Sequence, residues 1–109
     1  MFLKNAWEIY TFANTQKVPL DTAILMFRAN VMAGSAEGNP GGDLTDADYA
    51  ALKIEWDAMT SEERSKASAD CNKILWDNAD KLSTAFHFGE AGDRQEFDKI
   101  IADAIAAAE

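Results

Sequence analysis

Cysteine and histidine are almost absent from this chain, which has one residue of each type, Cys71 and His87. A single cysteine cannot form a disulfide within the chain, and one histidine with one cysteine cannot supply the four ligands of a structural zinc site. The two residues also lie about 24 Å apart along one predicted helix, which argues against a cysteine–histidine dyad. We therefore expect no metal and no cofactor, and we expect Cys71 to be a small buried side chain.

Long apolar runs are also missing. No stretch approaches the roughly 18 uncharged residues that a transmembrane helix requires. The first residues do not follow the charged, apolar and small-residue order of a secretory signal, because Glu8 interrupts the apolar positions. Together with the single cysteine, these absences favour a cytoplasmic protein without a membrane partner.

Basic residues are scarce. Ten basic residues stand against 19 acidic ones, so the formal net charge is -9, which opposes direct binding to nucleic acid or to anionic membranes. Up to Gly42 there are three acidic and three basic residues, so the whole net charge falls on the remainder of the sequence. A charged partner of this chain is expected to present a basic surface.

The apolar periodicity predicts an all-α fold, a compact bundle of about five helices forming a single domain over residues 1–109. The first predicted helix, over residues 2–14, has an unusually wide apolar arc. The second begins after Pro19 and ends at Gly34, and it is apolar almost all round. Residues 34–43 are rich in glycine and predict a flexible loop between the second and third helices.

Capping patterns place the remaining helix starts. A Thr or Asp followed three residues later by an acidic residue is typical of a helix N-terminus. Three such pairs come directly before predicted helices: Thr45–Asp48, Thr60–Glu63 and Asp93–Glu96. The third helix follows the first pair. The second pair opens a long fourth helix that Gly89 ends, and the third pair opens a fifth, amphipathic helix that includes Phe97, Ile100 and Ala104.

One polar set matches the residue types of a hydrolase triad. Asp80, Ser83 and His87 share a face of the predicted fourth helix, because their spacings are three and four residues. A regular helix interior has no free backbone N–H to form an oxyanion hole, so we expect a polar helix face and not an enzyme. Asp43, Asp46 and Asp48 alternate like the start of a calcium loop, but the central glycine and closing glutamate are absent.

Several acidic residues have no obvious partner along the chain. On the last two predicted helices many carboxylates have a basic residue four positions away, as in Asp77–Lys81. The acidic residues without such a neighbour are candidates for partner binding: Asp43, Asp46, Asp48, Glu55, Asp80 and Glu90. Trp76 falls off the apolar stripe. We expect its ring to be buried against another helix or a loop, with a role in an interface as the alternative.

Three functional hypotheses follow. The first is a non-enzymatic acidic protein that binds and blocks a larger, basic-surfaced partner such as a nucleic-acid-processing enzyme. Its most concrete form is a phage-type anti-defence inhibitor, an anti-CRISPR protein or a DNA mimic. The alternative is a homo-oligomeric assembly module, such as a homodimer, that uses the apolar N-terminal helices. The remote alternative is a hydrolase that uses Asp80, Ser83 and His87.

Overall fold

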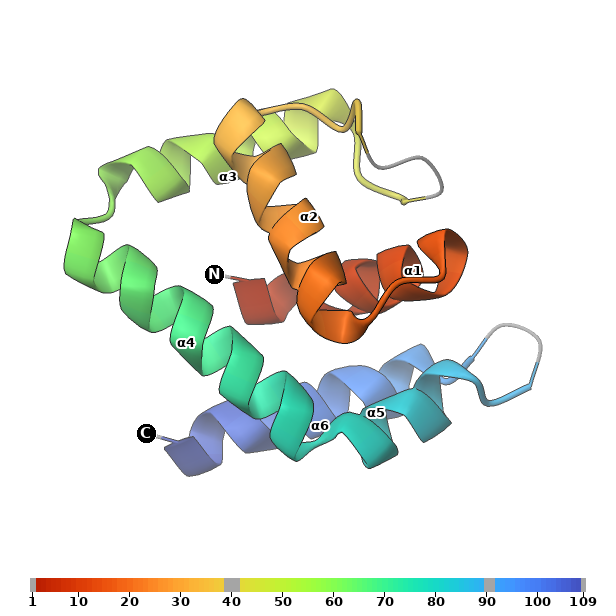
Figure 1. Cartoon of the computed structure of the whole chain (residues 1–109). Helices are drawn as coiled ribbons and strands as arrows, with labels where there is room; N and C mark the ends of the chain where they lie inside the picture. Colours follow the sequence, from red (N-terminus) through yellow and green to blue (C-terminus); the bar gives the residue numbers. More distant parts are fainter. Residues whose placement is uncertain (1, 39–41, 90–91, 109) are drawn as a thin grey trace. The chain divides into compact units, whose positions relative to one another are not determined.

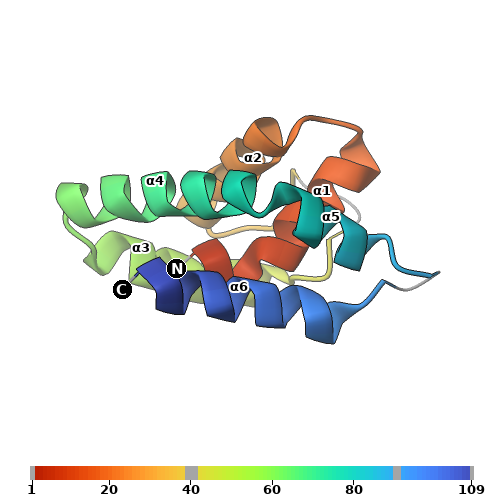
Figure 2. The ribbon, with the colours of Figure 1, turned by 90° about the horizontal axis from the view of Figure 1, so that it is seen from below.

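The computed structural model describes residues 2–38, 42–89 and 92–108. Within that part of the chain every regular element is a helix, which confirms the all-α class (Figures 1 and 2). The elements are the 3-10 helix η1 (Phe2–Asn5) and the α helices α1 (Ala6–Gln16), α2 (Leu20–Ala33), α3 (Asp46–Ala58), α4 (Ser61–Asp77), α5 (Ala79–Phe86) and α6 (Arg94–Ala108). No helix of the described residues combines the length and the apolar character needed to cross a membrane.

The predicted caps account for the starts of α3, α4 and α6 and for the end of α2. The backbone N–H of Asp48 donates to the Thr45 hydroxyl over 3.3 Å, and the Thr45 N–H donates to the Asp48 carboxylate over 2.8 Å. Thr60 and Glu63 form the same reciprocal pair at 2.9 and 3.1 Å. These bonds satisfy N–H groups that a helix start leaves without partners. Gly34 ends α2 in the left-handed conformation, with φ at 67°.

The predicted long fourth helix is wrong, because the structure divides it at Asn78 into α4 and α5. The side-chain amide of Asn78 donates to the Ile74 carbonyl over 2.9 Å, alongside the backbone N–H of the same residue at 3.2 Å. Asparagine side chains compete in this way with regular helix hydrogen bonding. The break also changes the charge pairing, since Asp77 accepts from Lys73 at 2.8 Å and not from Lys81.

The first predicted helix starts as the 3-10 turn η1 and becomes α-helical at Ala6. Part of its wide apolar arc is covered within the chain, because Ile9 and Phe12 are fully buried and Ala6 and Tyr10 nearly so, whereas Leu3, Trp7 and Ala13 are half-buried.

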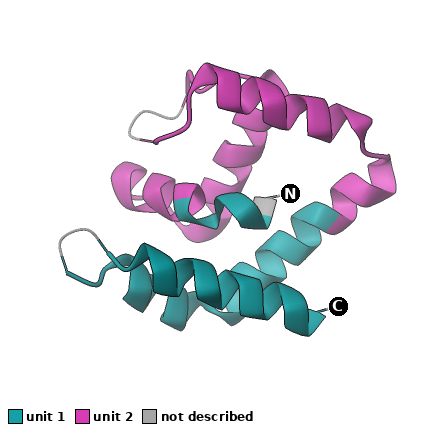
Figure 3. Ribbon diagram, turned by 180° about the vertical axis from the view of Figure 1, so that it is seen from behind, with its two compact units in different colours: residues 1–7, 67–109 teal, residues 8–66 magenta. Residues whose placement is uncertain are grey.

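The chain divides into two compact units (Figure 3). Unit 1 comprises Met1–Trp7 and Ala67–Glu109, and unit 2 comprises Glu8–Lys66. Unit 1 holds nine acidic and five basic residues, and unit 2 holds ten and five. The net charge is thus shared almost equally between the units, although it falls entirely after Gly42 when the sequence is read linearly.

Unit 2 has an aromatic core in which α2 packs against α3. The Phe27 ring lies 6.3 Å from that of Phe12 and 5.8 Å from that of Tyr49, measured between centroids. The guanidinium groups of Arg28 and Arg64 lie 5.3 and 5.5 Å from the centroid of the buried Trp56 ring. Both cations therefore contribute to packing within the unit.

Hydrogen bonds hold both ends of the predicted glycine-rich loop in unit 2. The buried Glu8 carboxylate accepts from the backbone N–H groups of Asp43 and Leu44 at 3.1 and 3.4 Å. The Asp46 carboxylate accepts from the Ala36 N–H at 2.8 Å and from the Ser35 hydroxyl at 3.3 Å. The described loop residues form no helix, as predicted. Residues 39–41 lie outside the described residues, and the flexibility of the loop stays a prediction.

Unit 2 also buries polar groups beside its aromatic core. The Tyr49 hydroxyl and the side-chain amide nitrogen of Asn30 are buried and make no hydrogen bond within the described residues. Burial, together with the nearby Glu8 carboxylate, raises the pKa of Tyr49 well above its usual value of 10.0. The phenol therefore stays neutral in the folded protein throughout the ordinary pH range.

Candidate functional site

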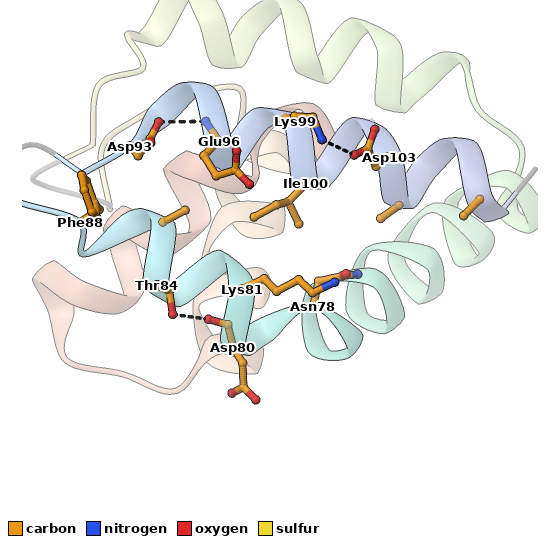
Figure 4. A pocket seen from close by; sticks show the side chains of 13 residues that line it. Asn78, Asp80, Lys81, Thr84, Phe88, Asp93, Glu96, Lys99, Ile100 and Asp103 are labelled. Atoms are coloured by element: carbon orange, nitrogen blue, oxygen red, sulfur yellow. Dashed lines mark hydrogen bonds and ion pairs between the residues drawn. The ribbon is translucent and has the colours of Figure 1, made fainter.

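Unit 1 contains a groove of about 900 Å³ between α5 and α6 (Figure 4). The two helices are joined by residues 87–93 and run back alongside each other (Figure 1). The lining combines apolar side chains with charged ones at the rim. It consists of Asn78, Asp80, Lys81, Thr84, Ala85, Phe88, Asp93, Glu96, Lys99, Ile100, Asp103, Ala104 and Ala107.

An aromatic cluster holds α5 against α6. The Trp7 ring lies 4.7 Å from that of Phe86 and meets the Phe97 ring edge-on at 5.1 Å, measured between centroids. Arg94 lies over the Trp7 ring, with its guanidinium carbon 5.1 Å from the ring centroid. The Asp93 N–H donates to the Ala85 carbonyl over 2.7 Å. The walls of the groove thus rest on packed rings and a direct backbone bond between the two helices.

The turn before α6 requires glycine. Gly92 has φ at 73°, a conformation that side chains rarely adopt. A Cβ atom at this position would lie 2.5 Å from the Phe86 carbonyl oxygen and 2.8 Å from the Trp7 ring. Close approach of the backbone at Gly92 therefore sets how α6 begins beside the end of α5.

The rim of the groove is acidic. Lys99 forms an ion pair with Asp103 at 3.0 Å, and Asp93 accepts from the Glu96 backbone N–H at 2.9 Å. The carboxylates of Asp80 and Glu96 make no hydrogen bond with another described residue, although the charge of Glu96, after that of Asp103, contributes to raising the pKa of Lys99. The Glu96 side chain points into the groove, whereas the Asp80 side chain points away from α6 (Figure 4). One carboxylate thus faces the groove with its acceptor oxygens available to a ligand.

The structure brings only part of the predicted acidic set to this groove. Asp80 lines it, whereas Asp43, Asp46, Asp48 and Glu55 are exposed residues of unit 2. Glu90 lies outside the described residues.

Two of the candidate acids of unit 2 are engaged within the chain. Asp46 holds the loop backbone at Ala36, and Asp48 completes the capping box of α3 with Thr45. Asp43 and Glu55 carry exposed carboxylates for which no such bond is found among the described residues. The selection of acidic residues by the absence of a basic residue at helical spacing thus missed partners that are backbone N–H groups.

Two aromatic side chains of unit 1 are exposed. Trp76 is 52% exposed, so the expected burial of its ring is wrong, and it does not line the groove. Phe88 is 66% exposed and does line the groove. Sequence reasoning missed Phe88, although an aromatic residue directly before the helix-ending Gly89 is a signal that could have identified it. Exposed rings of this size are common anchors of protein interfaces.

The hydrolase set is not assembled by side-chain contacts. No hydrogen bond joins the side chains of Asp80, Ser83 and His87 in the described part of the chain. The His87 ring meets Phe86 edge-on at 5.1 Å, and Asp80 alone of the three lines the groove.

The single cysteine lies in the interior. Cys71 is fully buried, as predicted, and burial raises its pKa to about 12. The side chain is therefore a neutral thiol at physiological pH and does not have the thiolate character of a nucleophile. Among the residues that the structure describes, no cluster of three or more His, Cys, Asp or Glu side chains could hold a metal ion.

Comparison with known proteins adds no relative. No family model matches the chain, and no curated protein or solved structure matches it either.

Proposed function

We propose that this protein is a non-enzymatic binding protein that occupies and blocks a basic surface of a larger partner. The observation that supports it most strongly is the groove of unit 1, where four acidic residues, Asp80, Asp93, Glu96 and Asp103, line the surface beside the exposed Phe88 ring. A surface of this kind favours cationic partners electrostatically and retains them through apolar burial.

Pairing within the chain supports the same proposal. Lys53, Lys73 and Lys99 each bond a carboxylate four residues further along their helix, at 2.9, 2.8 and 3.0 Å. These cations are thereby neutralised locally, and the net charge of -9 remains on other carboxylates. A nucleic-acid-processing enzyme is a partner of suitable chemistry, because its substrate cleft is basic.

The most concrete form of the proposal is a phage-type anti-defence inhibitor, such as an anti-CRISPR protein or a nucleic-acid mimic. Small size and strong negative charge support it by analogy with the class. The proposal includes that the two units fold as one cooperative domain, a compact bundle, and that the protein acts in the cytoplasm. Unfolding transitions that fail to coincide between probes in unit 1 and unit 2 would contradict the single domain.

Affinity capture from bacterial lysate tests the proposal directly. The tagged chain is expected to retain a near-stoichiometric nucleic-acid enzyme at low salt and to lose it as salt rises, because screening weakens contacts between exposed charges. The double variant Asp80→Asn with Glu96→Gln should retain less of that enzyme. The matched control is Asp98→Asn with Asp77→Asn, which changes the charge equally and alters residues outside the groove. Recovery of the tagged chain alone would contradict the proposal.

Self-association is a second candidate, favoured by an exposed apolar stripe on α2. Leu25, Ala29 and Met32 are exposed and share one face of the helix, since their spacings are four and three residues. A homodimer would cover this stripe. The Leu25→Glu variant should then elute as a monomer where the wild-type protein elutes as a dimer. A wild-type monomer at high concentration would contradict this alternative.

The hydrolase remains the remote alternative. A screen of acyl and phosphoryl substrates with a Ser83→Ala control tests it, and we expect no turnover that depends on Ser83. Turnover abolished by this substitution would overturn the non-enzymatic proposal.

A further inference from the structure

We infer that the groove between α5 and α6 binds an amphipathic α helix of a partner protein, with apolar residues on one face and Lys or Arg residues beside them. This inference rests on the proposed binding function and specifies its site and the chemistry of its partner. Figure 4 shows the groove between its two walls, with charged side chains along both.

The length of the groove suits a helix. Along the α6 wall the lining runs from Asp93, the residue before the helix, through Glu96, Ile100 and Ala104 to Ala107, with steps of three or four residues that keep to one face. The fourteen steps from Asp93 to Ala107 span roughly 21 Å, about four turns. The facing wall is shorter, because the eight residues of α5 span roughly 12 Å, and Phe88 lines the groove beyond its end. A third helix laid along this line would contact both walls in the manner of helix-in-groove recognition.

The depth of the groove suits close helix packing. Ala85 on α5 and Ala104 and Ala107 on α6 are lining residues with small side chains. Small residues let helix axes approach to the 8–10 Å or so that is typical of packed helices. Ile100 provides apolar area in the middle of the groove, and the exposed Phe88 ring provides it at one end. These side chains could bury the apolar face of the incoming helix.

An extended peptide fits less well. The walls are helices, whose backbone N–H and C=O groups bond within their own turns and so cannot add a strand to a sheet. An extended segment would therefore leave its own backbone groups without partners on an apolar floor. A helical segment satisfies its backbone internally and presents only side chains.

The charge of the groove selects a basic partner. Four acidic residues line it against two lysines, and Lys99 is already paired with Asp103 at 3.0 Å. Lys or Arg residues flanking the apolar face of the partner helix would meet Glu96, whose side chain points into the groove (Figure 4). A second copy of this chain is a poor occupant, because its net charge of -9 would be repelled.

A labelled peptide of about 15 residues matches this length and provides the test. Its leucines are spaced i, i+3, i+4 and i+7 and its other residues are lysines. A scrambled peptide of the same composition and a peptide with Glu in place of Lys are the controls. By fluorescence anisotropy with the full chain, we expect the amphipathic lysine peptide to bind at least about tenfold more tightly than either control, a difference of about 1.4 kcal/mol.

Matched pairs of variants locate the binding. Ala104→Lys fills the groove, whereas Ala102→Lys adds the same side chain to an exposed position of α6 outside the lining. Glu96→Lys reverses a rim charge, whereas Asp98→Lys makes an equal charge change off the groove. We expect at least about a tenfold loss of peptide affinity for Ala104→Lys and about three- to tenfold for Glu96→Lys. Both controls should stay within about twofold, with helicity of all four variants checked by circular dichroism.

The outcomes separate this inference from the proposed function. Equal affinity of Ala104→Lys and Ala102→Lys for the peptide, or equal binding of the scrambled peptide, would overturn the groove assignment. A captured partner that remains bound to Ala104→Lys would also overturn it and would leave the proposed function intact. If lysate capture yields no partner while the peptide pattern holds, the groove assignment stands and the proposed function fails.

Discussion

Unit 2 uses two carboxylates to hold the backbone of a long loop, whereas unit 1 points the Glu96 carboxylate into a groove. In unit 2 the buried Glu8 carboxylate and the exposed Asp46 carboxylate bond loop N–H groups. In unit 1 an aromatic cluster around Trp7 carries the packing, and the Glu96 carboxylate remains available in the groove. Since both units carry similar net charge, the number of acids alone does not indicate a binding surface. What matters is which carboxylates already have partners.

The largest expected effect comes from the aromatic cluster of unit 1. Phe97 is fully buried against Trp7, so Phe97→Ala should lower the free energy of unfolding by about 3 to 5 kcal/mol. Phe88→Ala is the control, because its exposed ring should change stability by less than about 0.5 kcal/mol. Chemical denaturation followed by circular dichroism measures both. Similar losses for the two variants would show that the cluster does not carry the packing of unit 1.

The corresponding test in unit 2 is substitution of Glu8, whose carboxylate is buried. Glu8→Ala removes the acceptor for the N–H groups of Asp43 and Leu44 and should cost about 2 to 3 kcal/mol. Glu8→Gln keeps one acceptor oxygen and should cost less, about 1 to 2 kcal/mol. Amide hydrogen exchange at residues 43 and 44 should accelerate in the same order. Unchanged exchange in Glu8→Ala would mean that the loop end is held by other contacts.

As pH rises into the alkaline range, the free energy of unfolding should fall first through Cys71 of unit 1 and then through Tyr49 of unit 2. Folding raises the pKa of Cys71 in unit 1 from 9.0 to about 12 and raises that of Tyr49 in unit 2 above 10.0. The folded protein favours the neutral form of both groups. The stabilisation is therefore complete below the unfolded pKa and falls as pH rises above it, by at most about 1.4 kcal/mol per pH unit and group.

Two variants show which group causes each part of the slope of the free energy of unfolding against pH. Cys71→Ala should remove the part of the slope that begins near pH 9.0, and Tyr49→Phe should remove the part that begins near pH 10.0. The measurement is the free energy of unfolding between about pH 8 and pH 11, with each variant compared with its own value at pH 8. A slope that persists unchanged in Cys71→Ala would show that the thiol is not the group that loses its proton first.

Local signals predicted helix ends well, because a cap depends on residues three positions apart. The Thr45–Asp48 and Thr60–Glu63 pairs and Gly34 all act as predicted. The groove could not be predicted in this way, since it depends on how α5 and α6 pack. Ile100 illustrates the difficulty: its position fits the apolar stripe of α6, yet it lines the groove instead of being fully buried like Phe97.

Nonlocal contacts also explain the other differences. The partners of Asp46 lie ten and eleven residues earlier in the chain, so no helical spacing could reveal them. The described elements leave the Trp76 ring 52% exposed. Its position off the apolar stripe could not show whether another helix or a loop would cover it. The charge division at Gly42 likewise disappeared once residues distant in sequence were grouped in the same unit.

The smallest expected effect concerns Asn78, where the sequence predicted a continuous helix and unit 1 has a break. Asn78→Ala removes the side-chain bond to the Ile74 carbonyl and introduces the residue with the highest helix propensity. We expect α4 and α5 to join, with stability changed by less than about 1 kcal/mol, because the lost hydrogen bond and the gained propensity offset each other.

Carbon chemical shifts at residues 77–79 report the joining, and Asn72→Ala in the middle of α4 is the matched control. Because Asn78 lines the groove, the joined helix should also weaken binding of the amphipathic lysine peptide, whereas Asn72→Ala should not. A break that persists in Asn78→Ala would place its cause in the packing of α5 against α6. In that case unit 1 would impose its geometry through tertiary contacts, as unit 2 does through the Glu8 carboxylate, and the contrast between the units would narrow.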